Sequence, residues 1–578
     1  MRPVRATPAP RTVSFRLRLG FAFGLLALAG AGLVVRAVQL QLVQHTQLAQ
    51  RGQRSSQYVS TIPAHRGMVT DRNGEPLAIS TPVDSVKLTP RDFDGDAESI
   101  RRLATALKVQ PRTLANSIAD GQGRPFMYLA RGLEPALART IDDMDIAGVS
   151  LEHRYRRFYP SGEVTLHLLG YTNVEDEGRG GVEQAWDTPL AGEDGRKRVL
   201  QTAKGERVDV ESLKSVLPGA DVHLSIDQRL QYLAYRELKS AVLANHARGG
   251  SLVMVDVDTG EVLAMVNQPS SNPNDREHFD VEAARNNSVV ETFEPGSSIK
   301  PFFVAAGMAA GRYSADSVID TGPGFIKINA TTTFHDEHVL GAIPLSVVLA
   351  KSSNVGMAIL ALHLEPRQIY SVLSGVGLGR NTQSYLPAEA AGTLQDYRRW
   401  HTVDIATMSH GYHLSVTTLQ LAQAYATLGA MGVHRPASLL RVDGPVAGER
   451  VLDPAICASL LHLLESVAST DGTAPLARIA GYHVAGKTGT AWKAGEEGYS
   501  ANHRYRGIFA GVAPVSHPRF AMAIVIDEPT AGKFMGGDVA APVFSAVMGG
   551  ALRLMGVPPD DVPAGSDALR LGTQVAAR

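Results

Sequence analysis

Residues 293–301 read Phe293-Glu294-Pro295-Gly296-Ser297-Ser298-Ile299-Lys300-Pro301, and the fold of the chain is organised around them. Ser297 and Lys300 are three residues apart, so a helix places the hydroxyl and the amine on one face, one turn apart. Pro301 lacks an N–H and fits best in a first turn, which predicts that a helix begins near Ser297 with its positive end there. In a dry pocket the amine of Lys300 loses proton affinity and can accept the serine proton. On its own this spacing is weak evidence, because a surface serine and a solvated lysine give the same pattern.

Length and composition restrict the class of protein. At 578 residues the chain is too long for one ordinary hydrophobic core, which predicts two or more domains. The net charge of −1 gives no indication of nucleic-acid binding. Cys457 is the single cysteine, which excludes an intrachain disulfide and a cysteine-rich zinc site.

The amino terminus predicts a membrane anchor. The first 18 residues contain no acid, and their basic residues are Arg2, Arg5, Arg11, Arg16 and Arg18. Leu19–Val35 is a run of uncharged, mostly apolar residues at the short end of a membrane-spanning length. Since arginines precede this run, we expect a cytoplasmic tail over 1–18, a transmembrane helix over 19–38 and the remaining chain outside. Two alternatives are an arginine-rich organellar transit peptide and a signal peptide cleaved near Ala27-Leu28-Ala29.

Residues 39–225 are predicted to form a first extracytoplasmic region without catalytic chemistry. Ala64–Gly74 reads as strand, tight turn and strand, because Asn73-Gly74 tolerates the positive φ angles of a hairpin turn. We find no nucleophile–base pair and no metal-ligand spacing in this part of the sequence. We therefore interpret it as a structural or partner-binding module.

Residues 226–556 carry strand and helix patterns of a second domain, and a polar tail follows over 557–578. A strand over 220–225 and a helix over 228–244 lead into an antiparallel hairpin of 251–257 with 261–266. The helices expected after the Ser297 helix span 344–364, 419–431 and 454–469. The later strands span 482–491, 507–513 and 520–527. This order predicts an α+β fold in which helices pack around an antiparallel sheet.

Two further motifs follow in order. Ser352-Ser353-Asn354 begins 55 residues after Ser297, and Lys487-Thr488-Gly489-Thr490 begins 133 residues after Asn354. Ser352 can pass a proton to a leaving nitrogen, while Asn354 can bind Lys300 and a substrate amide. We therefore assign catalytic roles to Ser297, Lys300, Ser352 and Asn354.

The third motif has the residue types that bind an anionic, extended substrate. Lys487 supplies a positive field for a carboxylate, which the hydroxyls of Thr488 and Thr490 can bind. Gly489 allows close approach of the backbone, and an edge strand at this place can pair with an extended peptide. We interpret these four residues as substrate-binding.

The ordered trio resembles that of the penicillin-binding proteins and serine β-lactamases. Arg66–Gly74 is similar to the pedestal motif of class B penicillin-binding proteins. The matches to the division-specific branch, the septal peptidoglycan transpeptidases of Gram-negative bacteria, are Arg157–Thr165, Gly180–Trp186, Phe293–Pro301 and Ala531-Gly532-Lys533 through Gly549-Gly550. The resemblance implies a transpeptidase domain over 226–556, an elongated α+β pedestal of the dimerisation type over 39–225, and one N-terminal transmembrane helix.

The activity that this resemblance implies is that of a D,D-transpeptidase crosslinking the septal wall. Ser297 would attack the penultimate D-Ala of a stem pentapeptide, release the terminal D-Ala, and pass the acyl group to a neighbouring stem's amine. The N–H groups of Ser297 and Thr490 would form the oxyanion hole. β-Lactams would mimic the donor and acylate Ser297 durably, and no metal or organic cofactor is implied.

The resemblance also implies a location and partners. The chain would cross the bacterial inner membrane once, with its catalytic domain in the periplasm and enriched at the division septum. Its substrates would be stem peptides of the lipid-linked precursor and of nascent glycan. Since no glycosyltransferase domain is recognisable in the sequence, it would work with a septal glycosyltransferase (FtsW-like) and other division proteins.

Four residues depart from the family pattern. The family usually has Gly-Tyr-Gly followed by Thr-Pro-Leu-Gln, whereas this chain has Gly411-Tyr412-His413 and Thr417-Thr418-Leu419-Gln420. His410 is a second unusual histidine, and Trp492 stands where a polar residue is common. Because histidine in place of glycine restricts the backbone and adds bulk, these changes favour a specialised paralogue with altered substrate preference and β-lactam affinity.

Other functions fit parts of the sequence. A class A β-lactamase needs a Glu-x-x-x-Asn segment, but the residue four places after Glu365 is Ile369. A β-lactam sensor signals through several membrane spans, and one is recognisable here. A non-catalytic division scaffold has no need of a complete motif set. A zinc hydrolase reading could begin at His335-Asp336-Glu337-His338, but this is not His-Glu-x-x-His, and we interpret it as a solvated loop.

Overall fold

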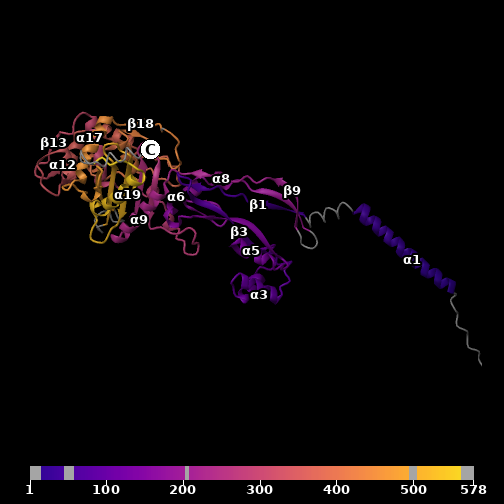
Figure 1. The fold of residues 1–578 in the computed structure, drawn as a ribbon. Helices are drawn as coiled ribbons and strands as arrows, with labels where there is room; N and C mark the ends of the chain where they lie inside the picture. Colours follow the sequence, from indigo (N-terminus) through magenta and orange to yellow (C-terminus); the bar gives the residue numbers. More distant parts are fainter. Residues whose placement is uncertain (1–14, 45–56, 202–206, 445, 494–503, 562–578) are drawn as a thin grey trace, which may run out of the picture. The chain divides into compact units, whose positions relative to one another are not determined.

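The computed structural model (Figure 1) describes residues 15–44, 57–201, 207–444, 446–493 and 504–561. The chain divides into two compact units, one comprising residues 1–64 with 193–217 and the other comprising 65–192 with 218–578. Most of the predicted cytoplasmic and carboxy-terminal tails lies outside the described residues.

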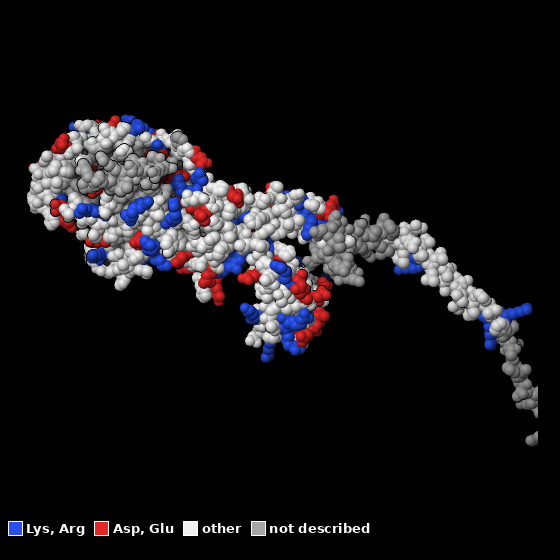
Figure 2. Space-filling view, in the orientation of Figure 1, with Lys and Arg blue, Asp and Glu red and all other residues white. Residues whose placement is uncertain are grey.

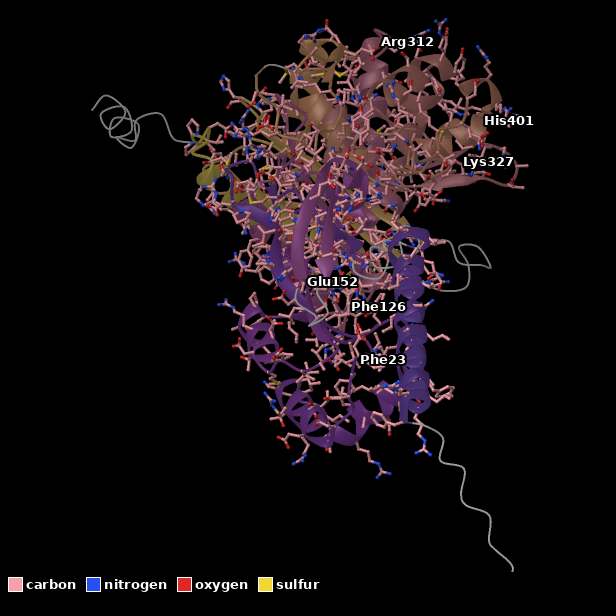
Figure 3. All side chains as sticks on the ribbon, turned by 90° about the vertical axis from the view of Figure 1, so that its right-hand side faces the viewer. Phe23, Phe126, Glu152, Arg312, Lys327 and His401 are labelled. Carbon is pink, nitrogen blue, oxygen red and sulfur yellow. The ribbon has the colours of Figure 1, made fainter. Side chains whose placement is uncertain are left out.

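Helix α1 (Phe15–Val38) has the length and composition of a membrane span. None of its residues is buried, and apolar side chains such as Phe23 project outward from it (Figure 3). Arginines gather at its two ends, and the surface between them carries no charge (Figure 2). The helix begins four residues before the predicted span and leads into a short π-helical segment, Gln39–Val43.

A small antiparallel sheet belongs to the same unit as α1. Its strand order is β1-β8-β9, with bounds β1 (Gln57–Ile62), β8 (Gly195–Gln201) and β9 (Arg207–Lys214).

The pedestal region (residues 65–192 with 218–223) of the second unit is built on a five-stranded sheet of order β10-β2-β3-β4, in which β5 also pairs with β3. The strands are β2 (Val69–Thr70), β3 (Pro76–Leu88), β4 (Met127–Leu133), β5 (Val149–Phe158) and β10 (Val222–His223). The helices are α3 (Ala97–Ala106), α4 (Pro111–Asp120), α5 (Pro135–Asp142), α6 (Leu166–Leu169), α7 (Gly181–Ala185) and α8 (Asp187–Ala191). The prediction of a strand from Ala64 is wrong, because residues 64–68 are irregular and the hairpin joins β2 to β3 around Gly74, where φ is +90°.

A buried charge cluster holds the pedestal region together. The carboxylate of Glu183, which is fully buried, accepts from Arg66 Nε at 2.8 Å and from Arg157 Nε at 2.6 Å. Arg157 Nη1 also donates to the carbonyl oxygen of Gly67 at 2.7 Å. Arg66 belongs to the pedestal motif and Arg157 to the later turn-rich segment, so the cluster joins residues about 90 positions apart.

The carboxy-terminal region (residues 224–561) contains an antiparallel sheet of order β12-β11-β21-β20-β19. Its strands are β11 (Gly249–Asp256), β12 (Val262–Gln268), β19 (Ala485–Trp492), β20 (Tyr505–Ala513) and β21 (Phe520–Asp527). The sequence predicts these five strands, with small shifts at their ends; the strand expected over 220–225 is the shorter β10, which pairs with β2 instead. The strand β19, which carries the third motif, is the last in this order, and no strand of the described residues pairs with its other edge.

Helices cover both faces of this sheet. On β11, an added Cβ at Gly250 would lie 3.1 Å from Leu238 of α9 (Gln228–Ala244), whereas Ser251 hydrogen-bonds Thr418 of α16 (Thr418–Gly429). Successive strand residues point to opposite faces, so α9 and α16 lie on opposite sides. Helix α19 (Ala541–Leu554) packs beside α9 (Figure 1).

The remaining helices are α10 (Asn287–Val290), α11 (Lys300–Ala309), α12 (Leu345–Ala350), α13 (Asn354–Leu362), α14 (Pro366–Gly375), α15 (Thr402–Met408), α17 (Pro454–Glu465) and α18 (Gly536–Val539). Of these, α10 and α17 pack against α16, while α11 and α13 begin at Lys300 and Asn354 of the first two motifs. Two small hairpins precede α12, formed by β13 (Val318–Asp320) with β16 (Ala342–Pro344) and by β14 (Phe325–Lys327) with β15 (Thr333–His335). Lys327, at the end of β14, projects at the margin of this region (Figure 3).

The buried charge cluster generates a stability prediction. Replacing Glu183 by Gln removes the counter-charge of the buried Arg157 and leaves Arg66 to pair with the partly exposed Asp187, so we expect the free energy of unfolding to fall by about 3 kcal/mol. Glu177→Gln is the matched control, since the Glu177–Arg179 pair is exposed and should change stability by less than about 0.5 kcal/mol. Urea unfolding of the detergent-solubilised chain, followed by tryptophan fluorescence, measures both; equal midpoints for the two variants would contradict the assignment.

Candidate active site

Ser297 lies on a tight turn that precedes a helix. The 3₁₀ turn η4 (Gly296–Ile299) leads directly into α11, and Pro301 occupies the first turn of α11 as predicted. The serine is therefore one turn ahead of the α-helix rather than inside it. In a 3₁₀ turn the side chains at i and i+3 eclipse each other, so Ser297 and Lys300 still point to the same side. No hydrogen bond of the Ser297 hydroxyl is found among the described residues.

Hydrogen bonds from neighbouring segments fix the main chain of this turn. Tyr425 of α16, fully buried, donates from its hydroxyl to the carbonyl oxygen of Ser298 at 2.8 Å. The Ser298 hydroxyl donates to Pro295 O at 2.7 Å, and Gly296 N donates to Gly411 O at 3.2 Å. These contacts fix the main chain around Ser297 while its own hydroxyl stays partly exposed.

The Lys300 amine is fully buried and surrounded by oxygens of the second motif. Its Nζ lies 2.6 Å from Ser352 O, 3.1 Å from Ser352 Oγ and 2.9 Å from Asn354 Oδ1. Burial lowers the pKa of Lys300 well below its usual value, and the positive charge of Lys487 lowers it further against an opposing effect of Asp336. The amine is thus prepared to be neutral at a pH where an exposed lysine is charged.

The second motif lies at a break between two helices. The prediction of one helix over 344–364 is wrong, because α12 ends at Ala350 and α13 begins at Asn354. Ser352 has φ +56°, and the Ser353 hydroxyl caps α13 by accepting from Gly356 N at 2.8 Å. This break turns the Ser352 side chain and the Asn354 amide toward Lys300.

Asp336 supports the second motif, and sequence reasoning missed it. Its carboxylate accepts from the Ser353 hydroxyl at 2.6 Å, from Asn354 N, and from Val355 N at 3.0 Å. A carboxylate at a helix N-terminus is favoured by the unpaired N–H groups and the dipole. His335, Glu337 and His338 are exposed, as expected of a solvated segment, but Asp336 is not free in solvent, because it caps α13 from 18 residues before Asn354.

The third motif lies on β19, directly against the Ser297 turn. An added Cβ at Gly489 would lie 2.6 Å from Pro295 O, so this position tolerates no side chain. An added Cβ at Gly296 would lie 3.2 Å from Thr490 O. The structure therefore brings all three predicted motifs to one site, with Lys300 contacting the second motif and the Ser297 turn packed on the third.

Lys487 is a second fully buried amine. Its Nζ lies 3.2 Å from Thr488 Oγ1 and 3.3 Å from Thr488 O, and no carboxylate pairs with it among the described residues. Burial lowers the pKa of Lys487 to about 7. Thr488 Oγ1 is also 3.0 Å from Thr473 Oγ1, and Thr490 Oγ1 accepts from Gly536 N at 3.2 Å. An anion that reached Lys487 would meet hydroxyls as well as a positive charge.

The two unusual histidines have different surroundings. His410 is buried, contacts Asn354 O through Nε2 at 3.0 Å and packs on the ring of Phe334 at 4.5 Å. Burial and the nearby Lys300 lower the pKa of His410 to about 4, so its ring is neutral at ordinary pH. His413 has φ +63°, the conformation that glycine adopts readily, and its ring contacts Asp404 at 3.1 Å.

The other two departures are Thr418, the first residue of α16, and Trp492, the last residue of β19. The Thr418 hydroxyl bonds Ser251 at 2.7 Å and so joins α16 to β11. Trp492 ends β19, donates from its backbone N to the Tyr412 hydroxyl at 3.4 Å and contacts the ring of Tyr505 edge-on. Trp492 therefore extends the side of β19 next to the third motif without altering the motif itself.

Comparison with known proteins gives matches over almost the whole chain. A family model of the penicillin binding protein transpeptidase domain matches residues 250–549, and one of the penicillin-binding protein dimerisation domain matches 61–224. The chain is 42% identical over 570 residues to the peptidoglycan D,D-transpeptidase FtsI of Escherichia coli K12, covering 98% of this chain and 96% of the relative. It is 40% identical over 547 residues to the probable peptidoglycan D,D-transpeptidase PbpC of Pseudomonas aeruginosa, covering 94% and 96%.

A solved structure agrees with the fold. Penicillin binding protein 3 from Mycobacterium tuberculosis, complexed with aztreonam, has a TM-score of 0.68 at 26% identity, covering 86% of this chain and 98% of the other. The α+β fold predicted from the sequence is confirmed.

The burial of Lys487 generates a prediction about stability and pH. Its pKa is about 7 in the folded chain and about 10.4 when unfolded, so the folded state binds fewer protons between these values. Wild-type stability therefore falls as the pH drops from 10 to 7 and then levels off. Lys487→Met removes this penalty and should raise the free energy of unfolding by on the order of 3 kcal/mol at pH 6, with the gain vanishing toward pH 10. Urea unfolding at several pH values measures it.

The matched control is Lys493→Met. Lys493 pairs with Asp527 at 2.7 Å and with Glu528 at 2.6 Å, so its removal should destabilise the chain rather than stabilise it. If both variants lost stability equally at pH 6, Lys487 would not be the unpaired buried amine described above.

Proposed function

The chain belongs to the penicillin-binding protein family, and on this premise we propose that it is a peptidoglycan D,D-transpeptidase acting through an acyl-enzyme on Ser297. The observation that carries the proposal is the buried Lys300 amine, which lies among the oxygens of Ser352 and Asn354, one turn from Ser297. The D,D-transpeptidases of E. coli and P. aeruginosa named above, similar over nearly their full length, support peptidoglycan as the substrate.

Lys300 is proposed as the general base for Ser297. A neutral amine has two N–H donors and one lone pair. Ser352 O and Asn354 Oδ1 accept the two donors, which leaves the lone pair for the proton of Ser297. Burial lowers the pKa of the amine and so favours its neutral form, which can activate the proposed nucleophile without a carboxylate or histidine.

The acyl transfer then follows in two halves. Ser297 Oγ attacks the carbonyl carbon of the penultimate D-Ala as its proton moves to Lys300, and the N–H groups of Ser297 and Thr490 are proposed to hold the oxyanion. Ser352 passes its proton to the nitrogen of the leaving D-Ala and takes the proton held by Lys300 in its place, and the C–N bond breaks to leave an ester on Ser297. The amine of a neighbouring stem peptide attacks this ester, gives up its proton to the same groups, and releases Ser297 as the new amide forms.

The third motif is proposed to bind the donor strand. The outer edge of β19 can pair with an extended stem peptide, and Lys487, Thr488 and Thr490 can hold its terminal carboxylate. A β-lactam carries a carboxylate near its reactive carbonyl, so it would use the same groups and acylate Ser297.

The remaining parts of the chain are proposed to set its location and partners. We assign α1 as an uncleaved inner-membrane anchor, with the amino terminus in the cytoplasm and the pedestal and catalytic region in the periplasm. We further propose that the pedestal binds an FtsW-like septal glycan polymerase and other division proteins, which would concentrate the enzyme at the septum. The domain limits proposed above for the anchor, pedestal and transpeptidase are retained.

Covalent labelling tests the proposed function. We expect a fluorescent penicillin to form a stable adduct with the wild-type chain and none with Ser297→Ala, because the ester oxygen is lost. Ser298→Ala is the matched control, since that hydroxyl bonds Pro295 O and takes no part in the chemistry; it should be labelled within about threefold of wild type. Rapid release of hydrolysed drug would instead indicate a β-lactamase. If the folded wild-type chain were not labelled at all, the result would indicate a non-catalytic scaffold.

The charge of Lys487 predicts that the rate of acylation depends on pH. The amine is charged below about pH 7 and neutral above it, so acylation by a penicillin carrying a free carboxylate should fall by about tenfold as the pH rises through that value. A penicillin methyl ester lacks the carboxylate, so its acylation rate should not fall as the pH rises through this value. Second-order acylation rates of the two compounds between pH 5.5 and 9 measure the effect, and parallel profiles would contradict the role of Lys487.

A further inference from the structure

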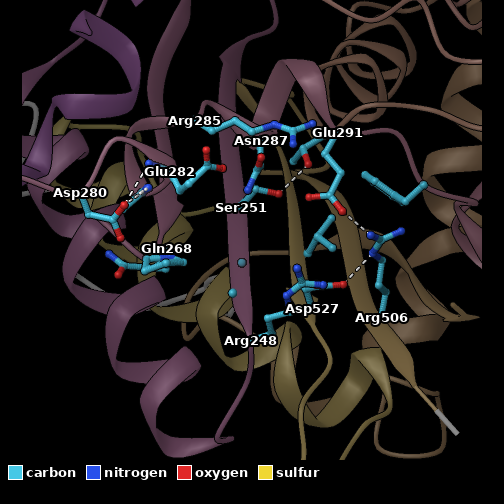
Figure 4. Close-up of a pocket in the computed structure, with 17 residues that line it drawn as sticks. Arg248, Ser251, Gln268, Asp280, Glu282, Arg285, Asn287, Glu291, Arg506 and Asp527 are labelled. Atoms are coloured by element: carbon cyan, nitrogen blue, oxygen red, sulfur yellow. Dashed lines mark hydrogen bonds and ion pairs between the residues drawn. The ribbon is translucent and has the colours of Figure 1, made fainter. Parts of the chain in front are cut away.

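A charged link joins the end of the sheet to the segment that leads into Ser297. Arg506 lies on β20 opposite Ala491, the residue that follows Thr490 on β19. Its Nε donates to Asp527 Oδ1 of β21 at 2.8 Å, and its Nη2 pairs with the carboxylate of Glu291. Figure 4 shows this arginine bridging the two carboxylates at one side of a cavity of about 490 Å³.

Glu291 stands six residues before Ser297, at the start of an extended segment. Phe293 and Val416 exchange two backbone hydrogen bonds of 2.9 Å, and Gly296 donates to Gly411. The segment is thus bonded along its length to residues 411–416, whereas its link to the end of the sheet is made through Arg506, whose guanidinium also lies 5.9 Å from the ring of Phe293.

The two carboxylates that contact Arg506 differ in how much they depend on it. Asp527 has a second cation, because Lys493 Nζ lies 2.7 Å from it. Glu291 has Arg506 as its one cationic partner among the described residues. The Arg506 side chain is 11% exposed and that of Glu291 36% exposed, so solvent from the cavity screens the pair only partly.

We propose that Arg506 is a positioning residue for acyl transfer. Its ion pair with Glu291 holds the segment before Ser297 in register with the end of β19–β20, and so fixes the nucleophile relative to Thr490. Misplacement of a nucleophile by a fraction of an ångström lowers the rate of the chemical step more than it weakens ligand binding. The inference rests on the proposed function, because it uses acylation of Ser297 as its readout.

The experiment separates binding from chemistry in the full-length, detergent-solubilised protein. Saturation kinetics with a fluorescent penicillin give the acylation rate constant and the apparent binding constant for Arg506→Met, Arg506→Lys, Glu291→Ala and the Arg506→Met/Glu291→Ala double variant. We expect either charge-removing substitution to lower the rate constant about tenfold with the binding constant unchanged, and the double variant to lose no more than one single variant. Arg506→Lys keeps the charge and should stay within about threefold of wild type.

Arg248→Met is the matched control, since Arg248 lines the same cavity and pairs with Glu528 at 3.3 Å. It should acylate as wild type does. The inference is overturned if Glu291→Ala or Arg506→Met acylates normally, if their losses multiply in the double variant, or if Arg248→Met is equally slow. Should Arg506→Met fail to fold, Glu291→Ala and Arg506→Lys still decide the question. Absence of labelling in wild type would refute the proposed function instead.

Discussion

The burial of the Lys300 amine without a carboxylate is the constraint on which the site depends. An ammonium group removed from water loses several kcal/mol of hydration unless a counter-charge replaces it. Here the replacing groups are carbonyl, hydroxyl and amide oxygens from Ser352 and Asn354. The nearest acid, Asp336, is already engaged by the N-terminus of α13. Burial therefore favours the neutral form of Lys300, which is the form that its proposed role as a general base requires.

A second buried amine gives the site its other property. The Lys487 amine contacts the hydroxyl of Thr488. Like Lys300, it pairs with no carboxylate among the described residues. Two buried amines oppose each other's charge, which lowers the pKa of Lys300 further. A chain optimised for stability alone would place methionine or leucine at Lys487. A lysine at this position is explained if the carboxylate of a bound ligand supplies the counter-charge, because binding then offsets the cost of burying the charged amine.

Much of this was readable from the sequence, and the remainder was not for identifiable reasons. The three motifs, the five strands of the catalytic sheet and the helix over 228–244 follow from local pattern and spacing. The polar residues Lys351–Asn354 interrupt the apolar pattern, but the sequence does not show which distant group stabilises a break there. Its cause is tertiary, namely the cap from Asp336 in a hairpin 18 residues earlier. The pair of Arg506 with Glu291 spans 215 residues and leaves no local signal at either end.

The packing of the main chain explains why Gly411 keeps the family's glycine while His413 departs from it. An added Cβ at Gly411 would lie 2.0 Å from Gly296 O, in the turn that carries the nucleophile, so no side chain fits there without moving Ser297. His413 shares the positive φ of the glycine that it replaces, but its side chain is about half exposed and meets Asp404 instead of the turn. The strain of a left-handed histidine is of order 1 kcal/mol and is borne by the backbone alone. Position 411 therefore has no room for a side chain, whereas position 413 accepts the histidine without a contact to the Ser297 turn.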